Sequence, residues 1–131
     1  MHLDNSIIVV ETGGMRIAHW GDNRPEPDEY VMGRLRGIDV LILPIDGSEH
    51  ILTAEDIAGL IDRLEPKVVI PMHYHIQGAV TVLSTLQTPD AWLDMMPDVI
   101  RHTEARWTFH RADIARYRRQ AFSFGNQYVR K

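Results

Sequence analysis

Cysteine is absent from this chain of 131 residues. Its absence excludes disulfide bonds, thiolate zinc sites and thiol nucleophiles. The sequence also lacks an apolar run near the roughly 18 residues that a membrane span needs, and its start does not have the pattern of a signal peptide. A phosphate-binding glycine loop and a Ser-His-Asp set at a nucleophile elbow are missing as well. We therefore expect a cytoplasmic protein that binds no membrane and that holds any metal through His, Asp or Glu.

An excess of positive charge is missing too. The chain has 14 Lys and Arg residues against 18 Asp and Glu residues, for a net charge of −4. This mildly acidic balance removes the electrostatic argument for nucleic acid as a partner. An apolar fraction of 44% and a charged fraction of 24% are typical of an ordinary globular domain. We predict one domain over residues 1–131.

The first 70 residues alternate between strand and helix patterns. A β-branched run is followed by Thr12-Gly13-Gly14, which predicts a tight hairpin turn. A hydroxyl cap at Thr53 with early acids predicts a helix that Pro66 ends. The elements predicted here are strands at 6–11 and 15–19, a helix at 28–35, a strand at 39–43, a helix that opens at 53–56 and stops at Pro66, and a strand at 67–70. The last three form a βαβ unit, so its two strands should be parallel.

The last third has weaker patterns. Thr88-Pro89 is a good helix start, and Pro97 ends that helix after Met96. Alternation over residues 106–110 predicts a half-exposed strand, and the arginine-rich stretch 112–120 predicts a short helix. Residues 121–124 have the pattern of a terminal edge strand. The predicted fold class is therefore α/β.

Two loops carry residues suited to metal binding, because open α/β sheets place reactive groups just beyond the carboxyl ends of their strands. The first loop is His19-Trp20-Gly21-Asp22, and the second is Pro71-Met72-His73-Tyr74-His75. Carboxylate and imidazole are ligands that Zn²⁺ or Mn²⁺ accepts without thiolate. A third loop, residues 44–50, follows the intervening strand and is expected to wall the same pocket.

Each of these residues also has a purely structural interpretation. Asp22 in a Gly-Asp-Asn sequence is typical of an Asx turn, and His73 of a core imidazole at a strand end. His73 and His75 would point the same way on an extended segment and could chelate a metal, although a turn between them would send His75 to solvent. His19 is open to three roles: ligand, support for a ligand, or buried hydrogen-bonding group. From the residues alone these alternatives stay open.

The ordered set of segments resembles the second half of metallo-β-lactamase-fold hydrolases, in a branch similar to L-ascorbate-6-phosphate lactonase. The resemblance covers about the first 75 residues. It rests on four segments in order: residues 5–11, Gly14 to Asp22, Asp39 to Pro44, and Pro66 to Tyr74. The resemblance implies half of a four-layer αββα sandwich, with a mixed sheet and helices on one face.

By that resemblance, Asp22 corresponds to the carboxylate that bridges two metal ions, and His73 to the last histidine ligand of the second metal. Both are therefore the expected catalytic and metal-binding residues. His19 corresponds to a residue that supports the bridging carboxylate. In this family a metal-bound hydroxide attacks a carbonyl or phosphoryl centre of a small-molecule substrate. Zinc is the expected metal, with manganese as the alternative.

The family's HxHxDH motif, which supplies most of its ligands, does not occur in this sequence. A further family histidine is missing as well, unless His2 takes its place. A catalytic zinc needs about three protein ligands, so we expect weak metal binding or none in the isolated chain. A mononuclear site from Asp22, His73 and His75, with His19 or His2, is a third alternative.

A half-sandwich leaves a sheet face uncovered, so we predict a homodimer in which two copies pack sheet on sheet. Two functions follow. The first is a metal-dependent hydrolase completed by a partner chain or by a missing N-terminal portion of a longer protein. The alternative is a non-catalytic half-domain that acts through self-association.

Overall fold

Two consecutive glycines turn the chain back at the start of the fold. Strands β1 (Ile8–Thr12) and β2 (Met15–His19) pair antiparallel, and Gly13 and Gly14 between them have φ values of 55° and 72°. Such positive φ values are required in the tight turns that match the twist of a hairpin. The computed structural model describes residues 5–46, 50–79 and 83–125. The predicted hairpin is confirmed.

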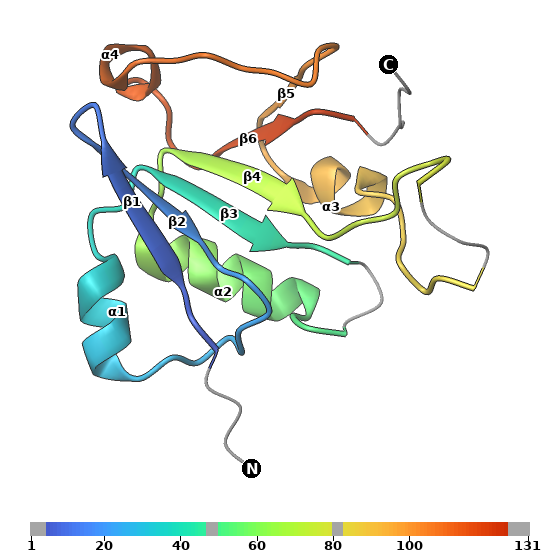
Figure 1. Ribbon diagram of the computed structural model, residues 1–131, viewed down its shortest axis with the longest axis horizontal. Coiled ribbons are helices and arrows are strands. Elements are labelled where there is room, and N and C mark those ends of the chain that lie inside the picture. Colours follow the sequence, from blue (N-terminus) through green and yellow to red (C-terminus); the bar gives the residue numbers. More distant parts are fainter. Residues whose placement is uncertain (1–4, 47–49, 80–82, 126–131) are drawn as a thin grey trace.

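A mixed six-stranded sheet follows from this hairpin, in the order β1-β2-β3-β4-β6-β5. Strands β3 (Val40–Pro44) and β4 (Val68–Met72) run parallel to β2. Strands β6 (Gln120–Ser123) and β5 (Val99–Arg101) extend the parallel part (Figure 1). The predicted βαβ unit is therefore present as β3, α2 and β4.

The predicted helix caps form as well. Thr53 caps α2 (Ala54–Leu64) through a capping box, in which its hydroxyl accepts from the Asp56 N–H and the Asp56 carboxylate accepts from the Thr53 N–H. Asp28 caps α1 (Glu29–Leu35) by accepting a hydrogen bond from the Val31 N–H at 2.8 Å. These bonds satisfy backbone donors that a helix start leaves unpaired.

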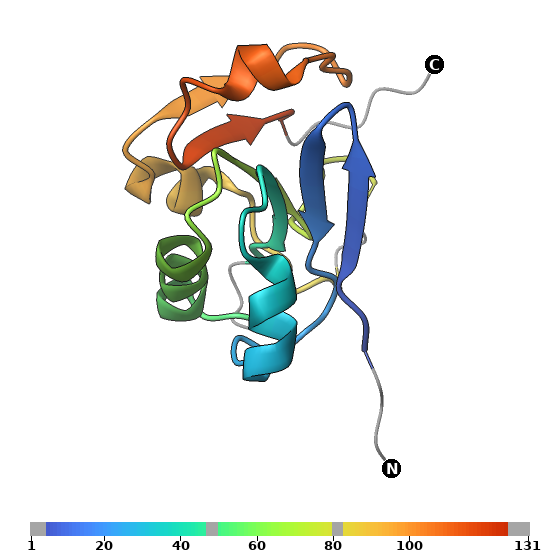
Figure 2. The ribbon, with the colours of Figure 1, turned by 90° about the vertical axis from the view of Figure 1, so that its left-hand side faces the viewer.

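The main core lies between the sheet and a layer of three helices: α1, α2 and α3 (Asp90–Met95). Buried side chains from both layers meet there, among them Leu41 of β3, Leu60 of α2 and Leu93 of α3. Figure 2 shows α1 and α2 together on one side of the sheet, with α4 (Arg111–Ile114) beyond β6. Within the described ranges, no helix has the length and apolar character that crossing a bilayer requires.

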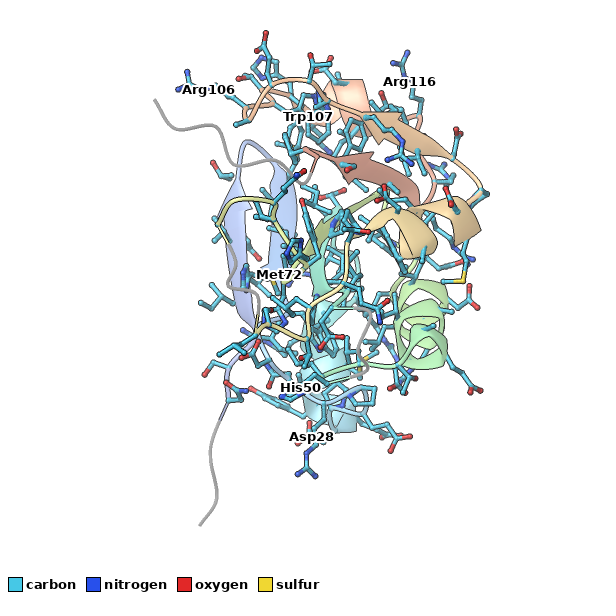
Figure 3. The ribbon with its side chains drawn as sticks, turned by 90° about the vertical axis from the view of Figure 1, so that its right-hand side faces the viewer. Asp28, His50, Met72, Arg106, Trp107 and Arg116 are labelled. Atoms are coloured by element: carbon cyan, nitrogen blue, oxygen red, sulfur yellow. The ribbon has the colours of Figure 1, made fainter. Side chains whose placement is uncertain are left out.

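The opposite face of the sheet is partly covered by the chain around α4. Ile114 is fully buried against Val40, Val68 and Phe122, and Trp107 packs on this cluster. Figure 3 shows Trp107 above β6, far from the end of the molecule where His50 and Asp28 lie. This covering layer protects the amino ends of β3 and β4 and leaves the carboxyl ends less covered.

The last third corrects three predictions. Residues 106–110 do not form a strand. The alternation of Trp107 and Phe109 with polar residues instead places both rings in an aromatic stack, in which Trp107 contacts Phe109 and Phe122. The helix predicted at 112–120 is the single turn α4. The segment predicted as an edge strand, β6, lies between β4 and the unpredicted strand β5. The short helix predicted at 88–96 is confirmed as α3.

Candidate functional site at the carboxyl edge of the sheet

The carboxyl ends of β2, β3 and β4 meet at one edge, since the three strands are parallel neighbours. His19, Ile42 and Ile70 form one rung across them. Asp22 and His73 lie in the loops that follow β2 and β4, each three residues beyond this rung in the sequence. Their loops are two strand spacings apart, roughly 10 Å. A carboxylate and an imidazole can reach toward each other across that distance.

The loop that carries Asp22 is fixed by its neighbours. Trp20 is fully buried, and its indole N–H donates to the Asn23 carbonyl at 3.0 Å. The Asn23 amide donates in return to the Trp20 carbonyl and to the Ser6 carbonyl at 3.1 Å. A large buried anchor and three hydrogen bonds therefore hold this turn.

Gly21 lets the chain turn outward just before Asp22. Its φ is +63°, and a Cβ at this position would lie 3.3 Å from the Ser6 carbonyl oxygen. Asn5 donates to the Asp22 carbonyl at 3.0 Å, which holds the main chain of Asp22. The Asp22 side chain is exposed, and no hydrogen bond or ion pair joins its carboxylate to the residues that the structure describes. The loop thus presents a carboxylate to solvent on a fixed backbone.

His73 lies in the left-handed backbone region, with φ of +54°. A bulky residue there costs about 1 kcal/mol or more, so the surrounding structure must impose this conformation. The segment is therefore not extended at His73, so the alternative in which an extended segment points His73 and His75 the same way does not apply. His73 is exposed at the edge, next to the end of β4.

Two contacts flank His73 on its carboxyl side. The Tyr74 hydroxyl donates to the Gly125 carbonyl at 2.8 Å, and burial raises the pKa of Tyr74. The His75 N–H donates to the Gln87 carbonyl at 2.8 Å, and the Gln87 N–H donates to the Asp46 carbonyl. His75 is half-buried. The sequence analysis gave Tyr74 no role, because its partner Gly125 lies 51 residues away.

His19 is exposed at the end of β2, and its Nδ1 accepts a hydrogen bond from the Gly21 N–H at 3.2 Å. A neutral imidazole that accepts at Nδ1 carries its proton on Nε2. In this arrangement the free nitrogen of His19 is a hydrogen-bond donor, and it has no lone pair to give a metal. The geometry thus favours a supporting role for His19 over that of a ligand.

Asp46 is a buried carboxylate at the same edge, at the end of β3 between the two loops. It is 1% exposed, and its Oδ2 accepts from the His50 N–H at 3.1 Å. The third loop of the sequence analysis thus reaches this edge at Asp46, whereas its residues 47–49 lie outside the described residues. The burial of Asp46 was not foreseen. Its position directly after the apolar strand between the two site loops is the signal that could have indicated it.

The described residues contain no cluster of three or more His, Cys, Asp or Glu side chains that could hold a metal ion. His2, which the sequence analysis considered as a further ligand, lies outside the described residues. Asp22 and His73 therefore share the edge as a pair of potential ligands.

The arrangement of strands and loops matches known proteins. Residues 2–73, more than half of the chain, match the family described as the beta-lactamase superfamily domain. The chain belongs to this family. The matched part runs from before β1 to His73 and includes both loops of the site.

Several curated relatives are similar over the same part. A UPF0173 metal-dependent hydrolase of Thermus thermophilus is 40% identical over 68 residues, which is 52% of this chain and 30% of the relative. The UPF0173 metal-dependent hydrolase of Symbiobacterium thermophilum is 41% identical over 69 residues, covering 50% of this chain and 30% of the relative. The chain thus spans about 30% of the length of the curated relatives it matches.

A solved structure from Thermotoga maritima shares the fold. It is described as a candidate zinc-dependent hydrolase of the metallo-β-lactamase superfamily, and it superposes with a TM-score of 0.66 at 22% sequence identity. The match covers 89% of this chain and 57% of the solved chain. The predicted family and the predicted α/β fold class are therefore confirmed.

Proposed function

We propose that this chain carries part of the metal centre of a metal-dependent hydrolase of the metallo-β-lactamase superfamily, with Asp22 and His73 as ligands. One observation carries the proposal: two exposed potential ligands from distant segments lie in loops at the same edge of the sheet, after strands that are two positions apart. The relatives described as metal-dependent hydrolases match this same part of the chain.

The donor set fits a metal in part. A carboxylate and an imidazole suit zinc and, as the alternative, manganese. A catalytic zinc takes about three protein ligands, and Asp22 and His73 provide two. The remaining ligands would come from another copy or from chain outside the described residues. We therefore expect the isolated chain to bind zinc weakly.

When bound, the metal would polarise a carbonyl or phosphoryl oxygen of a small-molecule substrate. The residues of the chain would do the rest. The turn from Trp20 to Asn23 holds the Asp22 main chain in place, so its carboxylate reaches the metal without reorganisation. His19 would donate from Nε2 toward a carboxylate or substrate oxygen at this edge.

The test is zinc binding by calorimetry on purified variants. Asp22→Ala and His73→Ala should each weaken binding at least about tenfold, as expected for loss of a ligand. Asp94→Ala and His110→Ala are matched controls, because both side chains are exposed and lie away from this edge. Unchanged zinc affinity in the Asp22 and His73 variants would contradict the proposal.

A second function is favoured by the lack of a three-ligand cluster in the described part of the chain. The chain would then be a non-catalytic half-domain that acts through self-association. Hydrolysis of lactone, β-lactam or phosphodiester substrates by the zinc-loaded or manganese-loaded chain would contradict it. The sheet-on-sheet homodimer stays a prediction, although the layer around α4 already occupies part of that face.

A further inference from the structure

Exposed apolar side chains gather around β1. Five large hydrophobic residues in the described ranges are exposed, and three of them belong to β1 or α1: Ile8 at 58%, Val10 at 50% and Tyr30 at 75%. Strand β1 is also an outer strand of the sheet, with β2 as its single neighbour. This corner therefore combines apolar surface with an unpaired strand edge.

The direction of the β1 backbone groups follows from the hairpin. In a two-residue turn the flanking pair, here Thr12 and Met15, is hydrogen-bonded, so alternate residues of β1 point toward β2. The hydrogen bonds of β2 to the next strand are consistent with this assignment. The Arg16 carbonyl accepts from the Asp39 N–H, and the Trp20 N–H donates to the Ile42 carbonyl of β3. The N–H and C=O groups of Val9 and Glu11 consequently point outward from the sheet.

Strand β1 has few of the features that block pairing at an edge. Proteins protect outer strands with charged residues, above all lysine, and with proline or a bulge. The sequence Ile8-Val9-Val10-Glu11-Thr12 has neither lysine nor proline, its five pairs with β2 run without interruption, and its one charged residue, Glu11, forms an ion pair with Arg16 of β2. Among the residues that the structure describes, the outer side of β1 is therefore open to a further pairing.

A groove of about 590 Å³ lies beside the strand, between β1 and α1. Ile7 and Val9 line it from the strand, and Val31 and Leu35 line it from the helix. Tyr30 and Arg34 stand on its helical side. The outer edge of β1 thus has apolar surface on both faces, with Ile8 and Val10 on the other one.

We propose that a second copy of this chain docks here, with the two β1 strands paired antiparallel about a two-fold axis at Val9. Residues directly opposite in an antiparallel pair share a face. In this register the outward groups of Val9 pair with those of Val9 in the other copy. Ile8 then lies opposite Val10 of the other copy, which joins the exposed apolar side chains into one stripe.

The charges of α1 are complementary in this arrangement. Helix α1 has the acidic residue Asp28 at its start and the basic residue Arg34 near its end, and both line the groove beside β1. It runs in roughly the same direction as β1 (Figure 1). Antiparallel β1 strands therefore make the two α1 helices antiparallel, so each acidic end faces the basic end of the other copy. An unrelated apolar peptide would gain no such match.

The proposal gives the self-association in the second proposed function a surface other than sheet-on-sheet packing, and it does not depend on metal binding. The first test needs no substitution. Sedimentation of the full chain without metal should show a dimer at high-micromolar concentration, and hydrogen exchange should show protected amides at Val9 and Glu11. A monomer would overturn the proposal. A dimer whose Val9 and Glu11 amides stay unprotected would also overturn it, because sheet-on-sheet packing leaves this edge open.

A substitution pair tests the apolar stripe. Ile8→Lys with Val10→Lys places like charges opposite each other and should weaken the dimer at least about tenfold. Met95→Lys is the matched control, since Met95 is 64% exposed on α3 and lies outside this corner. Circular dichroism checks that both variants fold. Equal dissociation constants for the two folded variants would contradict the proposal.

Removal of these charges tests the direction of the helices. Asp28→Asn, which keeps a helix cap, and Arg34→Gln should each weaken the dimer, because either change removes the opposite charges that face each other across the axis. The double variant should lose little more affinity than either single variant, because both changes remove the same pairs. Additive weakening in the double variant would overturn the antiparallel arrangement.

Discussion

The two edges of the parallel sheet use similar residues for opposite purposes. At the amino edge, Asp39 is 7% exposed and has three partners: it bonds the Lys67 ammonium, accepts from the Arg16 N–H at 2.9 Å, and its carbonyl accepts from the Val68 N–H. At the carboxyl edge, Asp22 and His73 are exposed, with backbones held in place. The first edge ties β2, β3 and β4 together, and the second presents side chains to solvent.

This difference shows how stability and function divide within one sheet. A carboxylate that is surrounded by its own cation and N–H donors stabilises the fold and has little capacity left for an external ligand. A carboxylate on a rigid loop with an open side chain contributes little to stability and is available for binding. Substitutions at the two edges should therefore separate the two properties.

The largest effect is expected from Asp39→Ala. This change removes the partner of the half-buried Lys67 ammonium and the acceptor of the Arg16 N–H. We expect a loss of about 2 to 3 kcal/mol in the free energy of unfolding, below the usual cost for a fully buried pair because Lys67 is partly exposed. Urea unfolding measures it, with zinc affinity unchanged.

Asp62→Ala is the matched control for Asp39. Asp62 also forms an ion pair, with Arg119, but both side chains are exposed. An exposed pair contributes about 0 to 1 kcal/mol, so this variant should stay close to the parent in stability. Equal losses of unfolding free energy in the two variants would mean that the ion pair of Asp39 contributes no more than an exposed surface pair.

The contribution of Asp39 to the free energy of unfolding should also depend on pH in acid. Burial by itself would raise the pKa of Asp39, but the hydrogen bonds from Lys67 and Arg16, with the charges of Lys67 and Arg111, outweigh it and lower the pKa. A lowered folded pKa means that the stabilisation is present above the unfolded value of about 3.9 and is lost as pH falls through the folded value. Asp39→Asn should flatten the pH dependence of unfolding below about pH 4. An unchanged acid profile would contradict this role.

A smaller effect is expected at the carboxyl edge from Gly21→Ala. The positive φ and the Ser6 carbonyl oxygen at 3.3 Å both oppose a side chain. The expected loss is about 1 to 2 kcal/mol, with weaker zinc binding because the turn before Asp22 must shift. Gly59→Ala in α2 is the control: its Cβ meets nothing within 4 Å, so it should stabilise the helix by about 0.5 to 1 kcal/mol. Calorimetric unfolding of both variants checks the signs.

The smallest effect is a gain in stability from His73→Gly. Glycine adopts the φ of +54° at His73 without steric cost, whereas alanine does not. The glycine variant should exceed His73→Ala in unfolding free energy by about 1 kcal/mol, while both lose zinc binding. A glycine variant no more stable than the alanine variant would show that His73 is not held against its backbone preference.

The first 72 residues agree with their sequence patterns because their signals are local. Glycines at positions 13 and 14 require the turn that closes the hairpin, and Thr53 with Asp56 caps α2 within four residues. The predicted helix at 28–35 and strand at 39–43 match α1 and β3 within a residue. Asp22 and His73 were candidates because of their places after two strands, and the resemblance to the metallo-β-lactamase fold selected them as the pair.

In the last third of the chain the sequence patterns predicted the structure poorly, because contacts between distant residues determine it. Trp107 and Phe109 alternate with polar residues, as apolar residues in a strand do, yet both rings stack in an aromatic group with Phe122. The ring centroids of Trp107 and Phe122 are 3.9 Å apart. Strand β5 has three residues, too few for a periodic signal. The placement of β6 between β4 and β5 depends on pairing across more than 50 residues. The zinc, the homodimer, the cytoplasmic location and the single domain over 1–131 stay predictions.

The sequence by itself determined the hairpin, the helix caps and the βαβ unit, because each depends on residues a few positions apart. The tertiary structure decided the rest. The order of the strands put the loops of Asp22 and His73 at one edge of the sheet and buried Asp46 at the same edge. It imposed a left-handed backbone on His73 and left the outer side of β1 unpaired in the described fold. These features depend on which segments become neighbours, and local propensity carries no information about that.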